Sequence, residues 1–318
     1  MEFGFSVMTS RTGATVSDLV HQVKLGEQLG FDMVAVSDHV VIPISINSTY
    51  PYSAGGAFTG SSSGDCLEQL TEAMFLAAHT TRIKVLTSVM VLPHRPPVLA
   101  AKALATIDVL SNGRLIVGVG AGWMREEFEA LGAPPFDKRG AVAAEYIQLF
   151  KELWTAKTPS FSGPYASISG VHFEPKPVQK PYPPIWVGGE SPSALRRAGR
   201  LGDAWYPIGS NPTYPMDTLA TLKAGIEAVR NHSREAGRTS VVATAYNAGW
   251  YDDRKAATAT DGSRRFLTGE PSQVAEDLHA LEQLGVRHVV LGFGAPSPLE
   301  IEKRMERFAN TVRPLTRR

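Results

Sequence analysis

Short apolar runs alternate with longer stretches of mixed polar and apolar residues along most of the chain. The run Met33-Val34-Ala35-Val36, inside an expected strand from Phe31 to Ser37, is apolar without alternation. Strands of this kind are typical of parallel sheets that are covered on both faces. The stretch before this run is amphipathic and predicts a helix with Ser17 as its N-cap and Gly30 just past its end.

The same unit recurs until eight strands are counted. The expected strands cover Glu2–Met8, Phe31–Ser37, Lys84–Val89, Leu115–Val119, Pro184–Gly188, Asp203–Pro207, Val241–Tyr246 and His288–Gly292. Helical patterns lie between or after them at Val98–Leu110, Gly140–Trp154, Ser193–Leu201, Met216–Arg234, Ser272–Leu284 and Ser297–Val312. Eight alternating units predict an α/β fold, a (β/α)8 TIM barrel in a single domain over residues 1–318. A doubly wound sheet is the alternative at this point, because strand closure is not visible in a sequence.

Glycines mark the ends of several predicted helices. Leu-Gly pairs stand immediately before three of the strands, with the glycines at Gly30, Gly202 and Gly285. Because glycine adopts the left-handed backbone conformation without a steric penalty, these residues predict C-terminal caps.

Two segments fit none of the repeating units and are expected to be insertions, one after strand 2 and one before strand 5. Val40–Gly64 is rich in serine, glycine and proline, and loops of this length in compact domains are usually functional or disordered. Thr155–Tyr182 carries five prolines, so it is expected to be an irregular excursion rather than a helix.

Composition narrows the class of protein. With 32 basic and 31 acidic side chains in 318 residues, the chain lacks the basic excess of nucleic-acid-binding proteins. It has no apolar run of about 18 residues, as a membrane span needs, and its first residues do not resemble a signal peptide. A single cysteine, Cys66, excludes an intrachain disulfide and a thiolate zinc site. We therefore expect a cytoplasmic protein that binds neither nucleic acid nor membrane.

In a (β/α)8 barrel, chemistry takes place where the strands end. Ser37-Asp38-His39 ends the second strand, and a histidine there can act as an acid or base near neutral pH. The alternative is that Asp38 caps the next segment and His39 is a structural residue of the rim. Thr87-Ser88-Val89 ends the third strand, where small hydroxyl residues either line a ligand site or simply form a turn.

The densest glycine cluster is Gly118-Val119-Gly120-Ala121-Gly122-Trp123. It differs from the dinucleotide fingerprint, because Trp123 stands at the third glycine position and no acidic residue follows at the required distance. Glycines here let a large flat ligand approach the backbone. Trp123 either covers that ligand or packs in the core.

A second glycine turn, Gly188-Gly189-Glu190-Ser191, leads from a strand into a helix. Free N–H groups at a helix N-terminus bind anions, and Arg196 and Arg197 add positive charge one turn later. A phosphate fits this turn only if the side chain of Glu190 points away. No His-x-His, Gly-x-Ser-x-Gly or paired-carboxylate pattern supports a metal hydrolase, a serine hydrolase or a glycosidase. We therefore expect no metal site.

Seven stretches, in this order along the chain, resemble the bacterial luciferase-like monooxygenase superfamily, and in particular its F420-dependent oxidoreductase branch. They are Ser37–Val40, Arg82–Val89, Leu110–Arg114, Gly118–Phe128, Lys176–Gln179, Pro184–Gly189 and Ala194–Trp205. One departure is that Cys66 follows Asp65 where relatives often have a proline.

The resemblance implies a barrel that holds a flavin or a 5-deazaflavin in its mouth. His39 would then face the redox centre with Asp38 beside it, and a non-proline cis peptide between Ser88 and Val89 would lie under the ring. The remaining cofactor contacts that the resemblance implies are a flank made of Gly120, Gly122 and Trp123, and a phosphate turn made of Gly188, Gly189, Glu190 and Ser191.

The function predicted on this basis is hydride transfer between F420 and a small organic substrate, with His39 as proton donor or acceptor. One alternative is an FMN-dependent monooxygenase that uses reduced flavin and O2, and another is a non-catalytic protein that binds flavin or F420. The Gly-Trp-x-x-Glu-Glu stretch that begins at Gly122 favours F420. The resemblance also implies a homodimer.

Overall fold

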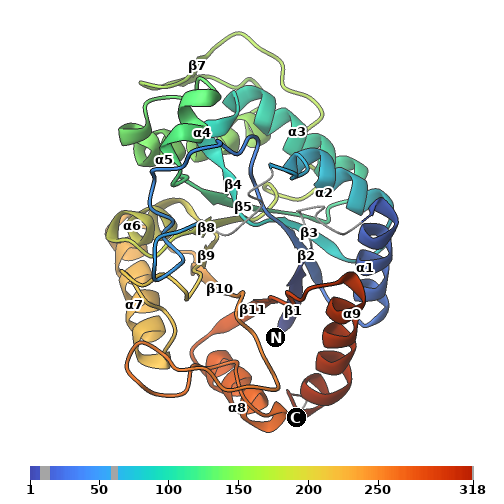
Figure 1. Cartoon of the computed structure of the whole chain (residues 1–318). Helices are drawn as coiled ribbons and strands as arrows, with labels where there is room; N and C mark the ends of the chain where they lie inside the picture. Colours follow the sequence, from blue (N-terminus) through green and yellow to red (C-terminus); the bar gives the residue numbers. More distant parts are fainter. Residues whose placement is uncertain (8–14, 59–63, 317–318) are drawn as a thin grey trace.

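Eight parallel strands form a closed ring in the computed structural model, which describes residues 1–7, 15–58 and 64–316 (Figure 1). The ring strands are β1 (Glu2–Ser6), β2 (Met33–Val36), β3 (Lys84–Thr87), β5 (Leu115–Gly120), β8 (Ile185–Gly188), β9 (Ala204–Tyr206), β10 (Ala243–Ala248) and β11 (Val286–Leu291). They are hydrogen-bonded in chain order, and β1 pairs with both β2 and β11. This closure confirms the predicted (β/α)8 TIM barrel and excludes the doubly wound sheet.

Helices surround the barrel and connect its strands. The principal ones are α1 (Val16–Gln28), α2 (Gln69–Ala78), α3 (Pro97–Leu110), α5 (Arg139–Thr155), α6 (Pro192–Leu201), α7 (Leu219–Glu235), α8 (Pro271–Gln283) and α9 (Pro298–Arg307). A short helix, α4 (Arg125–Ala130), follows β5, and single turns lie at η1 (Leu92–His94), η2 (Phe136–Lys138), η3 (Phe308–Val312) and η4 (Arg313–Thr316). None of the helices that the structure describes is long and apolar enough to cross a membrane.

Two apolar layers follow from the alternation of side chains along the strands. Outward-facing residues such as Phe5, Val34 and Val117 belong to the large cluster between the barrel and its helices. Inward-facing residues fill the barrel itself; they are Met33, Ala35, Leu86, Ile116, Trp186, Ala204, Tyr206, Ala245 and Val290. The barrel is therefore packed, and only its rims are available for chemistry.

Charged side chains close the amino-terminal end of the barrel. The carboxylate of Glu2 on β1 lies 3.0 Å from Lys84 Nζ on β3 and 3.1 Å from His288 Nδ1 on β11. The hydrogen bond from His288, together with the one from Lys84, lowers the pKa of Glu2 to about 2. The ring of Trp186 lies 4.8 Å from the ring of His288. This end is thus occupied by an ion cluster, which leaves the carboxyl-terminal ends of the strands for function.

One predicted helix cap is wrong, and another is correct in position but not in conformation. The N-cap of helix α1 is Thr15 rather than Ser17, because the Thr15 hydroxyl accepts from the Asp18 N–H while the Asp18 carboxylate accepts from the Thr15 N–H. Gly202 is the C-cap of α6, as predicted, but its φ of −81° lies outside the left-handed region; glycine fits there because an added Cβ would press on Val187. Gly30 and Gly285 do adopt positive φ angles, as predicted.

The strand ends differ from the prediction by a few residues. Residue Met8 of the first expected strand lies outside the described residues. The third expected strand stops at Thr87 and pairing with β5 resumes only at β4 (Met90–Val91). No predicted helix range covers α2, although the alternation of strands and helices predicts a helix after every strand.

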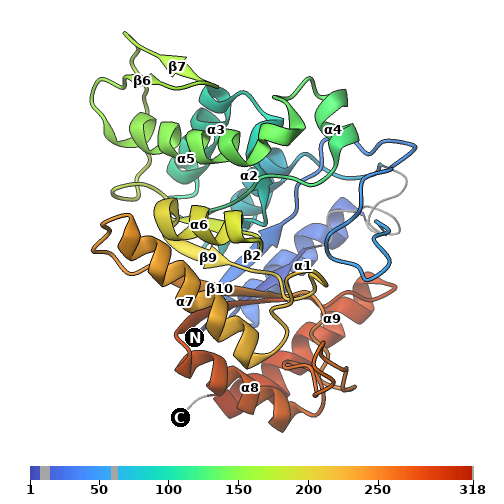
Figure 2. The same cartoon turned by 90° about the vertical axis from the view of Figure 1, so that its left-hand side faces the viewer.

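Both predicted insertions are present. The described part of the first, residues 40–58, has no helix or strand and runs from β2 past α4 toward α6 (Figure 1); residues 59–63 lie outside the described residues. The second contains a small hairpin of β6 (Phe161–Ser162) and β7 (Ser167–Ile168), which projects beyond α3 and α5 in Figure 2.

Candidate active site

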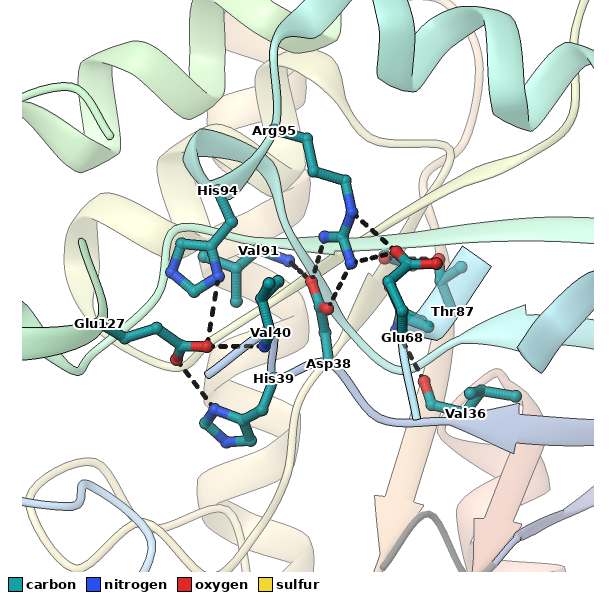
Figure 3. Close-up of polar contacts among 12 residues, drawn as sticks. Val36, Asp38, His39, Val40, Glu68, Thr87, Val91, His94, Arg95 and Glu127 are labelled. Carbon is teal, nitrogen blue, oxygen red and sulfur yellow. Dashed lines mark hydrogen bonds and ion pairs between the residues drawn. The ribbon is translucent and has the colours of Figure 1, made fainter. Parts of the chain in front are cut away.

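A histidine and a buried glutamate meet at the carboxyl-terminal end of β2. His39 Nδ1 lies 2.9 Å from Glu127 Oε2, and Glu127 comes from α4 (Figure 3). The side chain of Glu127 is only 1% exposed, whereas that of His39 is 19% exposed. Among the described residues, Glu127 is the polar partner of the His39 ring, so Nε2 stays available to a ligand.

Glu127 is held as a charged group although it is buried. Burial alone would raise its pKa, but the hydrogen bond and charge of His39 and the N–H of Val40 lower it. The N–H groups of Val40 and Val41 donate to Oε1 at 2.8 and 3.3 Å. A carboxylate can only accept, so the proton of a neutral His39 ring resides on Nδ1 and Nε2 is basic.

A second histidine shares this carboxylate without bonding to it. His94, in η1, is buried, and its Nδ1 lies 3.9 Å from Glu127 Oε1. Neither ring nitrogen has a hydrogen-bond partner in the part of the chain that the structure describes. Burial lowers the pKa of His94, so its ring is neutral near pH 7. A neutral His94 forms no ion pair with Glu127, and His39 is then the histidine that can form one.

Asp38 follows the same strand as His39, but its carboxylate contacts Arg95 and the backbone of Val91 rather than Glu127. Arg95 binds it through both terminal nitrogens at 2.8 Å, and the Val91 N–H donates to it at 2.8 Å (Figure 3). Arg95 also donates to Glu68 at the start of α2. These bonds suit Asp38 for fixing the backbone that precedes His39. The predicted catalytic role of Asp38 stays a prediction. The thiol of Cys66, at the departure from the family pattern, donates to the His39 carbonyl.

An interruption in the sheet lies beside these residues. The peptide bond between Ser88 and Val89 is cis, as the resemblance implied, and it separates β3 from β4. The Val89 side chain occupies the space next to two glycines: an added Cβ would lie 2.7 Å from it at Gly120 and 3.2 Å at Gly188. These glycines therefore make room for Val89, which places its side chain at the mouth of the barrel.

Polar groups from two other strands, β9 and β10, adjoin the same interruption. The Ser88 hydroxyl lies 3.0 Å from the Tyr206 hydroxyl of β9, and the Asn247 amide of β10 donates to that hydroxyl at 3.1 Å. Burial raises the pKa of Tyr206 well above its usual range. The phenol is thus a permanent hydrogen-bond donor beside Ser88.

Aromatic rings from the first insertion gather on Trp123. The ring of Trp123 lies 5.0 Å from that of Tyr50, 5.3 Å from that of Phe58 and 6.4 Å from that of His39. Gly122 precedes Trp123 with φ +84°, a conformation that favours glycine. Trp123 belongs to the predicted cofactor flank of Gly120, Gly122 and Trp123. Its ring thus lies beside His39, and rings of the first insertion pack on it.

The second glycine turn has the features of an anion site. Gly189 has φ +102°, and Ser191 is the N-cap of α6, accepting from the Ala194 N–H. Arg197, one turn later, is half-buried, and no carboxylate among the described residues raises its pKa; burial and the charge of Arg139 lower it. A half-buried cation without a carboxylate partner among these residues fits an anionic group such as the phosphate of a cofactor.

Glu190 points away from that turn, as phosphate binding requires. Its carboxylate accepts from the Ile208 N–H at 2.8 Å and from the Asn211 amide at 3.1 Å. Burial raises the pKa of Glu190 to about 7. The group ties the turn after β8 to the segment after β9, and near pH 7 it is protonated in about half of the molecules.

Four residues of the site were not singled out from the sequence as site residues: Glu127, His94, Tyr206 and Asn247. Glu127 carried a signal, because two consecutive carboxylates begin a short helix just after the glycine turn. The other three lie on strands or turns whose partners are far apart in the chain. Within the described part of the chain, no group of three or more His, Cys, Asp or Glu side chains is arranged to hold a metal ion.

Comparison with known proteins gives a family match over most of the chain. The sequence model described as luciferase-like monooxygenase matches residues 1–246. The chain is 31% identical over 294 residues to the FMNH(2)-dependent dimethylsulfone monooxygenase of Pseudomonas putida, with 79% of this chain and 78% of the relative covered. It is 30% identical to an uncharacterized protein of Mycobacterium tuberculosis, with 91% and 92% covered.

A solved structure shares the fold. An F420-dependent secondary alcohol dehydrogenase in complex with an F420-acetone adduct superposes with a TM-score of 0.77 over 100% of this chain and 99% of that one. Its sequence identity is 19%, so this likeness speaks for the barrel architecture alone.

Proposed function

Since the chain belongs to the luciferase-like monooxygenase family, we propose that it is an oxidoreductase that transfers a hydride between F420 and a small organic substrate. The observation that carries this proposal is the His39 imidazole, held through Nδ1 by the buried Glu127 carboxylate. A hydride transfer to or from carbon is accompanied by a proton on the neighbouring atom, and this ring is placed to exchange it.

The cofactor site proposed here uses the rim residues that the sequence predicted. Ser88 and Val89 would lie under the flat ring system, and Gly120, Gly122 and Trp123 would flank it. Gly188, Gly189 and Ser191 would hold the phosphate with help from Arg197, while the bonds of Glu190 fix the turn. F420, when bound, supplies or accepts the hydride.

The protein's own contribution is to position the substrate and to handle one proton. When the substrate is an alcohol, its C–H carbon gives up the hydride and its O–H proton passes to His39 Nε2, leaving a carbonyl product. The Glu127 carboxylate then stabilises the imidazolium through the Nδ1–H bond. In the reverse direction the imidazolium returns the proton to the carbonyl oxygen.

A second candidate is an FMN-dependent monooxygenase that uses reduced flavin and O2. The observation in its favour is the 31% identity to an FMNH(2)-dependent dimethylsulfone monooxygenase. The same rim residues serve either cofactor, so binding measurements distinguish the two candidates.

The test is a titration of the purified protein with F420 and with FMN, followed by turnover assays. We expect F420 to bind and FMN not to; tight FMN binding without F420 binding overturns the proposal in favour of the monooxygenase. Binding of either cofactor without turnover over a substrate panel favours a non-catalytic binding protein.

Replacing His39 tests the proton transfer directly. His39→Ala is expected to lower turnover by about 10²- to 10⁴-fold with cofactor affinity nearly unchanged. His79→Ala is the control, because that ring bonds to the carbonyl of its own helix at Phe75. Equal turnover in wild type and His39→Ala removes the proposed role. The homodimer and the cytoplasmic location expected from the sequence stay predictions, and sedimentation of the purified protein tests the first.

A further inference from the structure

Five rings form an aromatic cluster at the approach to His39. Besides the rings around Trp123 described above, Tyr50 lies 5.2 Å from Phe58 and 5.6 Å from Tyr52, and Phe58 lies 5.2 Å from His39. We call Tyr50, Tyr52, Phe58 and Trp123, with His39, the aromatic cluster. Three of its members come from the first insertion, a segment that the sequence alone marked only as long and rich in small residues.

The rings contact each other closely enough to exclude a ligand between them. Centroid separations of 5.0 to 5.6 Å with tilted or edge-to-face geometry are those of directly packed aromatic pairs. The His39 side chain beside these rings is 19% exposed. A substrate that approaches His39 from the side of the aromatic rings must therefore displace at least one of them from Trp123 or His39.

Displacing a ring costs the contacts that it makes. An apolar planar group restores those contacts when it packs on Trp123, whereas a small polar molecule does not. The cluster therefore favours substrates that carry such a group.

The charges around the cluster favour an uncharged substrate. Arg95, the guanidinium nearest to Asp38, is already neutralised by Asp38 and Glu68. Arg125 pairs with Asp137 and packs on the ring of Phe136. The groups closest to His39 itself are the carboxylate of Glu127 and the neutral ring of His94, neither of which attracts an anion.

Residues 40–48 of the first insertion are fixed by hydrogen bonds, and the aromatic rings of the insertion follow them in the chain. Glu126 accepts hydrogen bonds from the N–H groups of Asn47 and Ser48 at 2.7 and 3.0 Å and from the Ser48 hydroxyl. Glu127 holds Val40 and Val41 in the same way. The two ends of residues 40–48 are thus tied to α4, and Tyr50 and Phe58 are the side chains that can yield to a substrate.

We propose that the substrate is an uncharged carbonyl compound or alcohol that bears a planar apolar group, bound against Trp123 in place of the ring of Tyr50 or Phe58. This inference rests on the proposed function, because it names the substrate class of the same site. Its own evidence is the packing and charge of the aromatic cluster.

The test compares three ligands that differ in one property each. Acetophenone, cyclohexyl methyl ketone and the anion benzoylformate are titrated by ligand-observed NMR, with and without F420. Acetophenone is expected to bind about 2- to 10-fold more tightly than its cyclohexyl analogue, the range of one aromatic pair, and benzoylformate more weakly than acetophenone.

Substitutions locate the preference. Trp123→Leu and Phe58→Leu are each expected to reduce the ratio of acetophenone to cyclohexyl affinity toward one, while Tyr165→Leu, in the second insertion, leaves it unchanged. Two independent variants are used so that a folding defect in one, seen by thermal unfolding, does not decide the outcome. Tighter binding of benzoylformate, or an unchanged ratio in a folded Trp123→Leu or Phe58→Leu protein, overturns the inference.

Binding and turnover separate the two proposals. An aromatic preference without F420 turnover contradicts the proposed function and leaves the binding preference standing. Turnover of small polar alcohols with no aromatic preference contradicts the inference and leaves the proposed function standing.

Discussion

At the scale of single residues, Glu127 connects three parts of the chain that are distant in sequence. It accepts from His39 and from the backbone of Val40 and Val41, and it faces His94 from the segment after β4. A buried carboxylate with these partners keeps its charge, and that charge fixes the tautomer of His39. The catalytic hypothesis thus depends on a residue that never touches the substrate.

Glu127→Gln is expected to lower turnover on the order of 10²-fold while changing KM little. The amide keeps the size of the side chain but no longer stabilises an imidazolium, and it can present its NH2 to Nδ1 and so favour the wrong tautomer. Steady-state kinetics with F420 and a substrate measure the effect. The neighbouring Glu126→Gln is the matched control, since Glu126 contacts Asn47 and Ser48 and not His39; equal losses in both variants contradict the positioning role.

Glu190 predicts a pH dependence of stability. Its pKa is raised to about 7 by burial, so the folded state holds the proton more tightly than the unfolded chain does. Ionisation therefore destabilises the fold as the pH rises from the usual range of glutamate, about 4.3, through about 7. When the pH rises from 5 to 8, the free energy of unfolding of wild type should fall relative to that of Glu190→Gln by on the order of 1–3 kcal/mol.

Urea unfolding at both pH values measures this difference. The exposed Glu129→Gln serves as the control and should follow wild type at both. A Glu190→Gln protein whose free energy of unfolding changes with pH just as wild type does would show that Glu190 is ionised without cost in the fold.

At the scale of elements, the break between β3 and β4 shapes the mouth of the barrel. Thr87 ends β3 and donates its hydroxyl to the Gly118 carbonyl of β5, so the two strands are in close contact where the break begins. Glycines at 118, 120 and 188 face this region, and each leaves space for the backbone or the side chain opposite. The glycine cluster that the sequence offered as a ligand cradle thus first serves the packing of β3 against β5 and β8.

Gly118→Ala is therefore expected to be strongly destabilising, by about 3 kcal/mol or more. An added Cβ would overlap the backbone carbonyl of Thr87, which cannot move without breaking the sheet. Gly55→Ala is the control, because no atom of residues 1–7, 15–58 or 64–316 lies within 4 Å of its added Cβ. Thermal and urea unfolding compare the two; similar stabilities for both variants would show that the strands separate at little cost.

The elements that sequence could predict are those with a local cause. Some barrel strands, such as Met33–Val36, are continuous apolar runs, and each of the eight is predicted within a few residues of its observed position. The cap at Thr15 was missed because Ser17 is an equally good cap by type, and only the reciprocal bonds with Asp18 decide. Gly202 caps α6 as predicted, but its backbone is not left-handed; the glycine is needed because of its contact with Val187, a residue in another element.

The residues of the site also divide into those with a local sequence signal and those whose position depends on distant parts of the chain. His39 and the turn at Gly188 and Gly189 follow strands directly, so their position at the rim could be predicted. The partner of His39 is 88 residues away, and the rings of Tyr50 and Phe58 reach Trp123 only through the path of an insertion without regular structure. No local pattern encodes such long-range contacts.

At the scale of the whole molecule, the two ends of the barrel have separate tasks. The candidate site lies at the carboxyl-terminal rim, whereas Glu2, Lys84 and His288 form an ion cluster at the other rim and join the first strand to the last. Residues at this second rim should affect stability without affecting chemistry.

Glu2→Gln tests that separation. The pKa of Glu2 is lowered to about 2, so its ionised form stabilises the fold above the usual glutamate range, and this contribution is lost as the pH falls toward 2. Because the side chain is 37% exposed and screened by solvent, the variant should lose only about 1 kcal/mol at pH 7. That deficit should shrink as the pH is lowered below about 4, and kcat and KM should match wild type throughout the range where both proteins are folded. A change in kcat or KM in Glu2→Gln would mean that the barrel transmits strain from one rim to the other, and that its ends are not independent.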